Sequence, residues 1–264
     1  MSRLAAICDR RRAEVRAWAL SVDLTDLQRR AVPCTTDVLT ALRRPADVVT
    51  PRVIAEHKRR SPSKGWIRQG SSAPDVARAY ADAGAAAISV LTDLTDFGGT
   101  TDDLIAVRSA LAIPVLRKDF MLSPLQILES RALGADLILL IVAALQPGEL
   151  TSLYRLATDL GMTALIEVHD AHELDVALRL DPRLIGINAR NLHTLEVDLD
   201  AFAELGRRIP PGPVRVAESG MTTSRELLRA AALGYDAVLV GEHLMRAPEP
   251  GQALRALLAG VAPT

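Results

Sequence analysis

The sequence has few cysteines. Cys8 and Cys34 are the only two among 264 residues. Both lie in the N-terminal part of the chain, without the spacing of a metal site and without a secretory context. A disulfide framework and a zinc site therefore have little support, and we expect no metal. Because cysteines that are not paired suit a reducing compartment, we expect a cytoplasmic protein.

An excess of one charge and a long hydrophobic run are also missing. The formal net charge is −1, so no global field would attract nucleic acid or an anionic membrane. Short basic clusters such as Arg10-Arg11-Arg12 are interpreted as exposed helix faces. The longest apolar run, 137–145, is too short to cross a bilayer. The N-terminus is charged within its first helix-like turns, so we expect no targeting segment there. We expect neither nucleic acid nor membrane as a partner.

What the sequence does have is a regular alternation of short apolar runs with longer amphipathic stretches. Such runs recur roughly every 20 to 30 residues, as expected for about eight βα units. The predicted strands are Val53–Lys58, Ala86–Leu91, Pro114–Lys118, Leu137–Val142, Thr163–Val168, Leu184–Asn188, Val214–Glu218 and Ala237–Val240. Several of these runs are continuously apolar, which indicates strands buried on both faces and hence a parallel sheet.

The stretches between the strands carry helix signals. Helices are predicted from Pro74-Asp75 to Ala83-Gly84, from Ser123-Pro124 to Leu133-Gly134 and from Thr223-Ser224 to Leu233-Gly234. Each of them pairs an N-terminal cap or proline with a glycine stop. Repeated βα units predict an α/β protein, a (β/α)8 TIM barrel.

The first fifty or so residues precede the first strand and have helical periodicity over Leu4–Leu20 and Asp37–Leu42. So short a segment seldom builds a core of its own. We therefore expect one domain over residues 1–264, with an N-terminal helical extension at 1–50 and the barrel at 51–264.

Polar residues cluster at the carboxyl ends of the predicted strands, where barrels carry their active sites. Glu56 and Lys58 alternate along the first strand and so share a face, while His57 points to the other. Taken alone, this pair could equally lie on a solvated surface strand. The strand interiors are otherwise apolar, however, and other strands end in the same way. These ends supply Ser61, Lys118, Asp119-Phe120, Glu167, Asn188, Arg190, Glu218-Ser219-Gly220 and Gly241-Glu242.

The charges at these ends balance, with Lys58, Lys118 and Arg190 against three glutamates. Small residues after the last two strands place free backbone N–H groups where barrels commonly bind phosphate. Gly220 and Gly241 therefore suggest a phosphorylated substrate, although they could simply form tight turns.

Two other chemistries compete for the same residues. His169 and His172 are three apart and could ligate a metal, but histidines at a helix start are more often surface caps, and no third His or Cys ends a strand. Lys118 could form a Schiff base. Nearby carboxylates would instead favour its ammonium form, which makes it a better general acid.

The whole chain resembles the indole-3-glycerol phosphate synthase family. The motifs that carry the resemblance are Ile54-Ala55-Glu56-x-Lys58, Ser61-Pro62-Ser63-Lys64-Gly65, Ile88-Ser89-Val90-Leu91-Thr92, Leu116-Arg117-Lys118-Asp119-Phe120, Gly134-Ala135-Asp136, Leu165-Ile166-Glu167-Val168, Gly186-Ile187-Asn188-x-Arg190-Asn191-Leu192, Ala217-Glu218-Ser219-Gly220 and Val240-Gly241-Glu242. Each is weak alone, but their order and spacing together are very specific.

The resemblance implies conversion of 1-(o-carboxyphenylamino)-1-deoxyribulose 5-phosphate to indole-3-glycerol phosphate without a cofactor. It implies Lys118 as general acid at the ketone, Lys58 at the substrate carboxylate, and Glu167 as partner acid/base assisted by Glu56. Asn188, Arg190 and Glu218 would line the anthranilate and hydroxyl side, with Ser219 beside them.

For the phosphate we expect the backbone N–H groups of Gly220 and Gly241, with the Ser61 hydroxyl. Glu242 should contribute its backbone alone, because an inward carboxylate would repel the phosphate. Phe97 and Phe120 are candidate walls for the aromatic ring, although either could be ordinary core.

Three alternatives stay open at this stage. Another phosphosugar barrel is possible, either phosphoribosylanthranilate isomerase or the tryptophan synthase α subunit. The isomerase would need a cysteine at a strand end, and both cysteines here precede the first strand. A noncatalytic phosphate-binding subunit would have no use for Lys58, Lys118 and Glu167. We expect a monomer.

Overall fold

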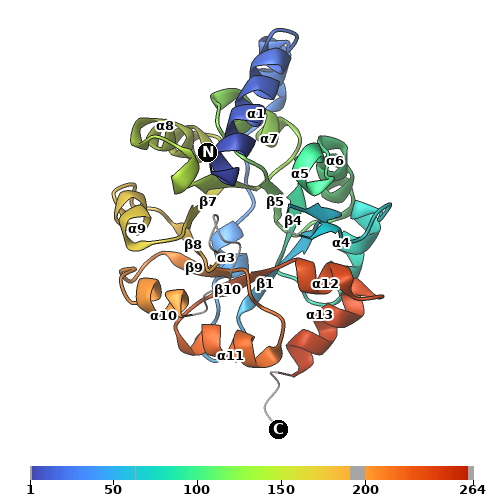
Figure 1. The fold of residues 1–264 in the computed structure, drawn as a ribbon, viewed down its shortest axis with the longest axis vertical. Coiled ribbons are helices and arrows are strands. Elements are labelled where there is room, and N and C mark those ends of the chain that lie inside the picture. Colours follow the sequence, from blue (N-terminus) through green and yellow to red (C-terminus); the bar gives the residue numbers. More distant parts are fainter. Residues whose placement is uncertain (1, 63, 191–199, 261–264) are drawn as a thin grey trace.

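The computed structural model describes residues 2–62, 64–190 and 200–260. Eight parallel strands form a closed barrel in the order β1-β10-β9-β8-β7-β6-β5-β4, and helices surround it (Figure 1). This confirms the predicted (β/α)8 barrel. Ser63, Asn191 and Leu192 of the motifs and the last four residues of the chain lie outside the described residues.

The barrel strands follow the prediction to within one residue at each end. They are β1 Arg52–His57, β4 Ala87–Leu91, β5 Val115–Lys118, β6 Leu137–Ile141, β7 Thr163–Val168, β8 Leu184–Asn188, β9 Val214–Glu218 and β10 Ala237–Val240. Lys58 lies one residue beyond β1. Parallel registers such as Glu56 beside Ser89 and Asn188 beside Glu218 bring the polar strand ends to one level.

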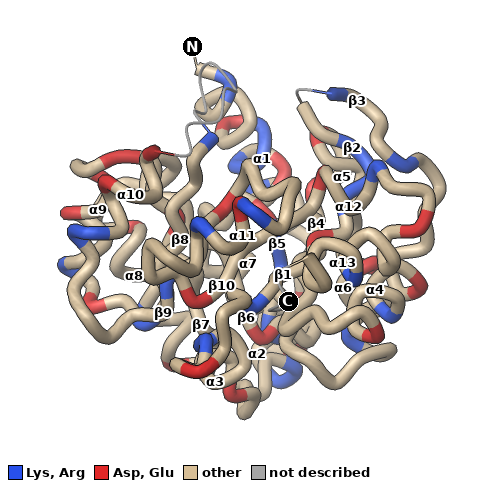
Figure 2. The backbone as a smooth tube through the Cα atoms, turned by 90° about the horizontal axis from the view of Figure 1, so that it is seen from below, with Lys and Arg blue, Asp and Glu red and all other residues tan. Residues whose placement is uncertain are grey.

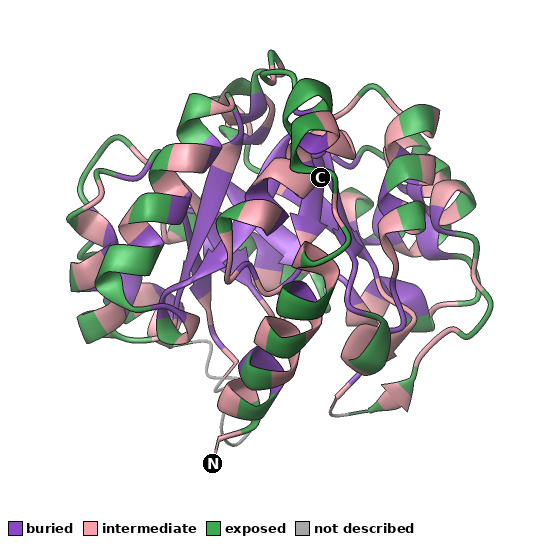
Figure 3. Ribbon diagram, turned by 90° about the horizontal axis from the view of Figure 1, so that it is seen from above, coloured by how far each residue is buried: buried purple, intermediate pink, exposed green. Residues whose placement is uncertain are grey.

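Alternation along the strands divides the core into two layers. One set of side chains, including Ile54, Leu116, Leu165 and Leu239, fills the barrel interior. The intervening residues pack against the helices in a second cluster. Every residue of β6 is buried, as expected for a strand covered on both faces. Figure 3 shows the buried strands at the centre, with exposed residues on the outer helices and loops.

The helices that cover the barrel are capped as their sequences predict. Ser123 caps α7 through the backbone N–H of Leu125, and Thr223 and Glu226 form a capping box on α11. The outer elements are α4 Ala73–Asp82, α5 Leu94–Phe97, α6 Thr101–Ala110, α7 Pro124–Ala132, η1 Val142–Ala144, α8 Pro147–Asp159, α9 Ala171–Leu178, α10 Ala201–Gly206, α11 Ser224–Ala232, α12 Glu242–Arg246 and α13 Pro250–Ala259.

The N-terminal extension consists of α1 Arg3–Ala19, α2 Leu24–Arg30 and α3 Val38–Leu42. The helical periodicity predicted α1 and α3 but missed α2, which is only seven residues long. After β1 the chain forms a small antiparallel pair, β2 Arg60–Ser61 with β3 Gly65–Trp66, where only a turn was predicted. The start of α1 and this hairpin lie at the same end of the molecule (Figure 2).

The interpretation of Arg10 and Arg11 as an exposed helix face is wrong. Arg10 pairs with Asp93 and Asp96, and Arg11 Nη2 lies 2.7 Å from Asp119 Oδ2. The side chains of Asp93 and Asp119 are fully buried. Buried carboxylates need partners. Here the partners are arginines of α1, which pair with aspartates just after β4 and β5.

No helix in the described part of the chain is both long and apolar enough to span a membrane.

Candidate active site

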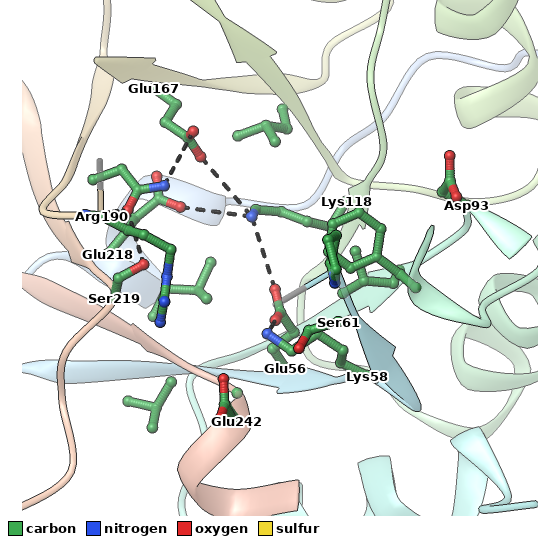
Figure 4. Close-up of a pocket in the computed structure, with 18 of the residues that line it drawn as sticks. Glu56, Lys58, Ser61, Asp93, Lys118, Glu167, Arg190, Glu218, Ser219 and Glu242 are labelled. Atoms are coloured by element: carbon green, nitrogen blue, oxygen red, sulfur yellow. Dashed lines mark hydrogen bonds and ion pairs between the residues drawn. The ribbon is translucent and has the colours of Figure 1, made fainter. Parts of the chain in front are cut away.

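A cavity of about 480 Å³ opens at the carboxyl ends of the barrel strands (Figure 4). Every residue that the sequence predicted for the site lines it. These are Glu56, Lys58, Ser61, Phe97, Lys118, Phe120, Glu167, Asn188, Arg190, Glu218, Ser219, Gly220, Gly241 and Glu242. The strand registers explain this convergence, because parallel strands in a barrel end at the same rim.

Lys118, the last residue of β5, lies at the centre of the charged groups. Its Nζ is 3.9 Å from a carboxylate oxygen of Glu56, 3.9 Å from Glu167 and 3.8 Å from Glu218. Burial alone would lower the pKa of Lys118, but these three carboxyl groups outweigh it and raise the pKa above its usual value. Lys118 is therefore an ammonium ion, suited to donate a proton or stabilise an oxyanion and unsuited to form a Schiff base.

Glu56 and Lys58 form the ion pair that their spacing suggested. Lys58 Nζ donates to Glu56 Oε1 at 2.8 Å, and Ser89 Oγ lies 3.3 Å from Glu56 Oε2. Burial would raise the pKa of Glu56, but Lys58 and Lys118 lower it below its usual value. Glu56 is thus a carboxylate shared by both lysines.

Glu167, at the end of β7, is held by Asn188 from the neighbouring strand. Asn188 Nδ2 donates to Glu167 Oε1 at 3.2 Å, while Asn188 Oδ1 accepts from the backbone N–H of Arg190 and from Ser219 Oγ. The two donors on the oxygen side fix the orientation of the Asn188 amide. Asn188 therefore holds the Glu167 carboxylate in place, and this contact does not depend on a bound ligand.

The protonation states of Glu167 and Glu218 differ. Burial opposes ionisation of Glu167, but His169, Lys118 and Asn188 lower its pKa to about 2. Burial raises the pKa of Glu218 well above its usual value, and the Glu167 carboxylate adds to this more than Lys118 subtracts. Like charges this close cannot both ionise cheaply, so the raised pKa makes Glu218 the carboxyl group of the pair that favours its protonated form.

His169 is not the surface cap that the sequence suggested. Its side chain is only 12% exposed, its Nε2 lies 3.3 Å from Glu167 Oε1, and its Nδ1 lies 3.1 Å from Glu173 Oε2. His172 is exposed, so the two histidines do not share a site. The signal for His169 was its place two residues after Glu167, together with the carboxylate of Glu173 one helical turn further on.

The loops that follow β9 and β10 have the features expected of an anion site. The residues Ser219 and Gly220 both have positive φ, 70° and 81°, a conformation that costs energy for serine. Gly241 leaves no room for a side chain, because an added Cβ would lie 2.6 Å from Glu56 Oε1. The carboxylate of Glu242 is paired with Arg246 at 3.1 Å, and this pairing offsets its repulsion of an anion.

The two phenylalanines lie together on one wall. The ring centroids of Phe97 and Phe120 are 6.3 Å apart with an interplanar angle of 39°. Above them, Arg3, Leu4 and Ile7 of α1 also line the cavity. Sequence reasoning missed these three residues, since nothing in a helical repeat tells which strand ends the helix will cover.

No group of three or more His, Cys, Asp or Glu side chains among the described residues is arranged to hold a metal ion. The charged groups gathered around Lys118 are instead the Lys58 side chain and the carboxyl groups of Glu56, Glu167 and Glu218. Such a set can donate and accept protons and can bind an anionic, partly aromatic ligand.

The solved structures similar to this chain show its fold. The 3-hexulose-6-phosphate synthase from Salmonella typhimurium has a TM-score of 0.63 at 15% identity, over 80% of this chain and 98% of that one. The thiamine phosphate pyrophosphorylase from Pyrococcus furiosus has a TM-score of 0.59 at 15% identity, and the match covers 81% of this chain and 96% of that one. At this identity the likeness extends to the barrel alone.

Sequence comparisons go further. The family model for indole-3-glycerol phosphate synthase matches residues 4–257. A protein named indole-3-glycerol phosphate synthase from Mycobacterium sp. (strain KMS) is 50% identical over 256 residues, 96% of this chain and 93% of the relative. A protein of the same name from Mycobacteroides abscessus is 48% identical over 264 residues, which are 99% of this chain and 96% of the relative. The charged barrel mouth and these matches together place the chain in the indole-3-glycerol phosphate synthase family.

Proposed function

We propose that the chain carries out the ring closure of its family with Lys118 as the general acid and Glu167 as the base. The substrate is 1-(o-carboxyphenylamino)-1-deoxyribulose 5-phosphate and the product indole-3-glycerol phosphate. The observation that carries this assignment is the position of Lys118 within 4 Å of three glutamates, whose pKa values are lowered for Glu56 and Glu167 and raised for Glu218. One cavity thus offers an acid and a base without help from a metal.

Ring closure needs positive charge at the ketone oxygen. The ring carbon that bears the carboxylate attacks the ketone carbon, and Lys118 Nζ gives a proton to the oxygen as the new carbon–carbon bond forms. The aromatic carbon is a poor nucleophile, so a preorganised ammonium in a shielded cavity supplies much of the stabilisation. Carbon dioxide then leaves, and its bonding electrons restore the aromatic ring.

Lys58 is assigned to the substrate carboxylate. It is 15% exposed and already paired with Glu56, so an incoming carboxylate would share its ammonium rather than meet an unpaired charge. The Phe97 and Phe120 wall is assigned to the aromatic ring, with Arg190 on the anthranilate side. These contacts would hold the reacting atoms close together, which is where much of the acceleration of an intramolecular reaction comes from.

Loss of water completes the reaction. The hydroxyl leaves with a proton from an ammonium, for which Lys58 is the candidate, and Glu167 takes a proton from the neighbouring carbon. Glu56 balances both lysines as they change charge. Glu218, being neutral, is suited to donate a hydrogen bond to a substrate hydroxyl. The phosphate is assigned to the backbone N–H groups of Gly220 and Gly241 with the Ser61 hydroxyl, whose oxygen has no hydrogen-bond partner among the described residues.

The direct test is to incubate the purified protein with the carboxyphenylamino-deoxyribulose phosphate, without added metal, and to follow the indole absorbance. We expect product, and its absence at every enzyme concentration would refute the assignment. In Lys118→Ala, turnover should fall by about a thousandfold, since general acids contribute factors of this order. Substrate binding, measured by titration, should change little. Near-normal turnover would remove Lys118 from the role of acid.

A further inference from the structure

His169 lies behind Glu167 and outside the residues that line the cavity. It is the first residue after β7, and Asp170 then caps α9. Its backbone N–H donates to Glu173 Oε2 at 2.8 Å, and the same oxygen lies 3.1 Å from its Nδ1. Glu173 therefore fixes both the backbone and the ring of His169, and the other ring nitrogen, Nε2, lies at ion-pair distance from Glu167 without making a hydrogen bond among the described residues.

The contacts of Glu167 divide between its two oxygens. Oε1 receives Asn188 Nδ2 at 3.2 Å and lies 3.3 Å from His169 Nε2. Oε2 lies 3.9 Å from Lys118 Nζ and has no hydrogen-bond partner among the described residues. Asn188 and His169 thus hold Oε1, whereas Oε2 is left free beside Lys118 and could take up a proton there.

The charges around His169 favour its protonated form. Glu167 on its own strand and Glu173 on α9 face its two ring nitrogens. The η1 segment that packs on β7 and α9, Val142–Ala144, has only apolar side chains. Beyond Glu167, Glu56, Glu218 and Lys118 face the cavity. Burial lowers the pKa of His169, but the two glutamates outweigh it and raise the pKa to about 10.

We propose that His169, fixed by Glu173, is a positioning residue that keeps Glu167 ionised and turns its Oε2 toward the cavity. The imidazolium stays protonated and transfers no proton itself. The proposal rests on the role of Glu167 as the base. It extends that role by naming the charge that allows two neighbouring carboxyl groups, Glu167 and Glu218, to hold different protonation states in one cavity.

The test is the pH dependence of turnover in His169→Gln, which keeps a polar side chain but loses the charge. An opposite charge this close lowers a carboxyl pKa by about one to three units, so the acid limb of kcat should move to higher pH. Relative to wild type, with a Glu167 pKa that starts at about 2, kcat should fall by up to about twofold at pH 5 and up to about tenfold at pH 4, with little change at pH 8, because one pKa unit is a factor of ten. KM should change little, since His169 does not line the cavity.

His172→Gln is the matched control, because it makes the same change three residues away on an exposed side chain. It should keep the wild-type pH profile. A His169→Gln profile that coincides with wild type would overturn the proposal. A uniform loss of kcat at all pH values would do the same, since it would indicate a structural role only.

A second measurement needs no activity and no altered His169. In the folded wild-type protein, the imidazole NMR signals of His169 should remain in the protonated position through pH 8. They should titrate at lower pH in Glu173→Gln, which retains an acceptor for the His169 backbone N–H. A wild-type titration near the ordinary histidine value of about 6.5 would overturn the proposal. If wild type makes no product but this titration is as expected, the proposed reaction fails and the positioning by His169 stands.

Discussion

At the scale of single residues, the cavity shows how neighbours give identical side chains different chemistry. Glu56 and Glu167 are ionised because ammonium and imidazolium groups outweigh the cost of burial. The pKa of Glu218 is raised because the side chain is buried, because Glu167 is its neighbour, and because both of its own oxygens lack hydrogen-bond donors among the described residues. The electrostatic surroundings of each glutamate, and not its residue type, set its protonation and therefore its chemical role.

This difference predicts unequal effects of two isosteric substitutions. Glutamine resembles a protonated glutamate, so Glu218→Gln should keep KM close to wild type and lower kcat less than tenfold, whereas Glu167→Gln removes the base and should lower kcat about a hundredfold or more. Steady-state kinetics at pH 7.5 would measure both. A larger loss in Glu218→Gln than in Glu167→Gln would reverse the assigned roles.

At the scale of elements, the site depends on how closely the strand ends and helix starts approach. The start of α12 packs so closely against the end of β1 that a Cβ added to Gly241 would lie 2.6 Å from Glu56 Oε1. Similarly, an added Cβ on Gly186 of β8 would lie 2.1 Å from Glu218 Oε1. These glycines are needed for space beside a carboxyl group, and Gly241 also combines φ −129° with ψ −71°, which lies outside the regions that other residues favour.

Gly241→Ala should therefore displace the Glu56 carboxylate from its two lysines. We expect overpacking to lower the free energy of unfolding by about 1 to 3 kcal/mol, and turnover to fall about tenfold or more because the charged groups lose their alignment. Kinetic assays and urea denaturation would measure both.

Gly148→Ala serves as the control for this change. Gly148 lies on α8 with nothing within 4 Å of an added Cβ, so the protein should be as stable as wild type or more stable by about 0.5 kcal/mol. Equal behaviour of the two variants would show that the contact between Gly241 and Glu56 is unimportant.

At the scale of the whole molecule, the N-terminal extension is joined to the barrel through buried charge. Arg117 is 1% exposed and pairs with Asp119 and Glu129, and Arg11 of α1 completes the network at Asp119. Asp119 directly follows Lys118. The same pairing that holds α1 over the barrel therefore also holds the chain at the end of β5.

Arg11→Ala should loosen α1 and leave Asp119 partly unpaired. We expect the free energy of unfolding to fall by about 2 kcal/mol, as for a lost hydrogen bond to a charged group. The KM should rise because Leu4 and Ile7 of α1 line the cavity. Thermal denaturation and steady-state kinetics would measure the two effects.

The matched control is Arg29→Ala on α2, whose pair with Asp26 is exposed. An exposed pair contributes little to stability, so this variant should behave almost as wild type. If Arg11→Ala were as mild as Arg29→Ala, α1 would be held by its apolar contacts and not by the buried network.

Much of the fold followed from local patterns. Period-two and continuous apolar runs located all eight barrel strands, because burial on one or both faces leaves a direct record in the sequence. Caps and glycine stops located helices such as α7 and α11. The short α2 and the β2–β3 hairpin were missed, since elements of a few residues have too few positions to show a period.

The sequence by itself determined the barrel and the set of polar residues at its rim, because strand length and alternation fix which residues end each strand. Only the tertiary structure decided how these residues act. It placed α1 over the cavity, brought Glu218 beside Glu167 and put His169 behind Glu167 where a surface cap was expected. Protonation depends on distances of a few ångströms between residues far apart in the chain, and such distances exist only once the barrel has closed.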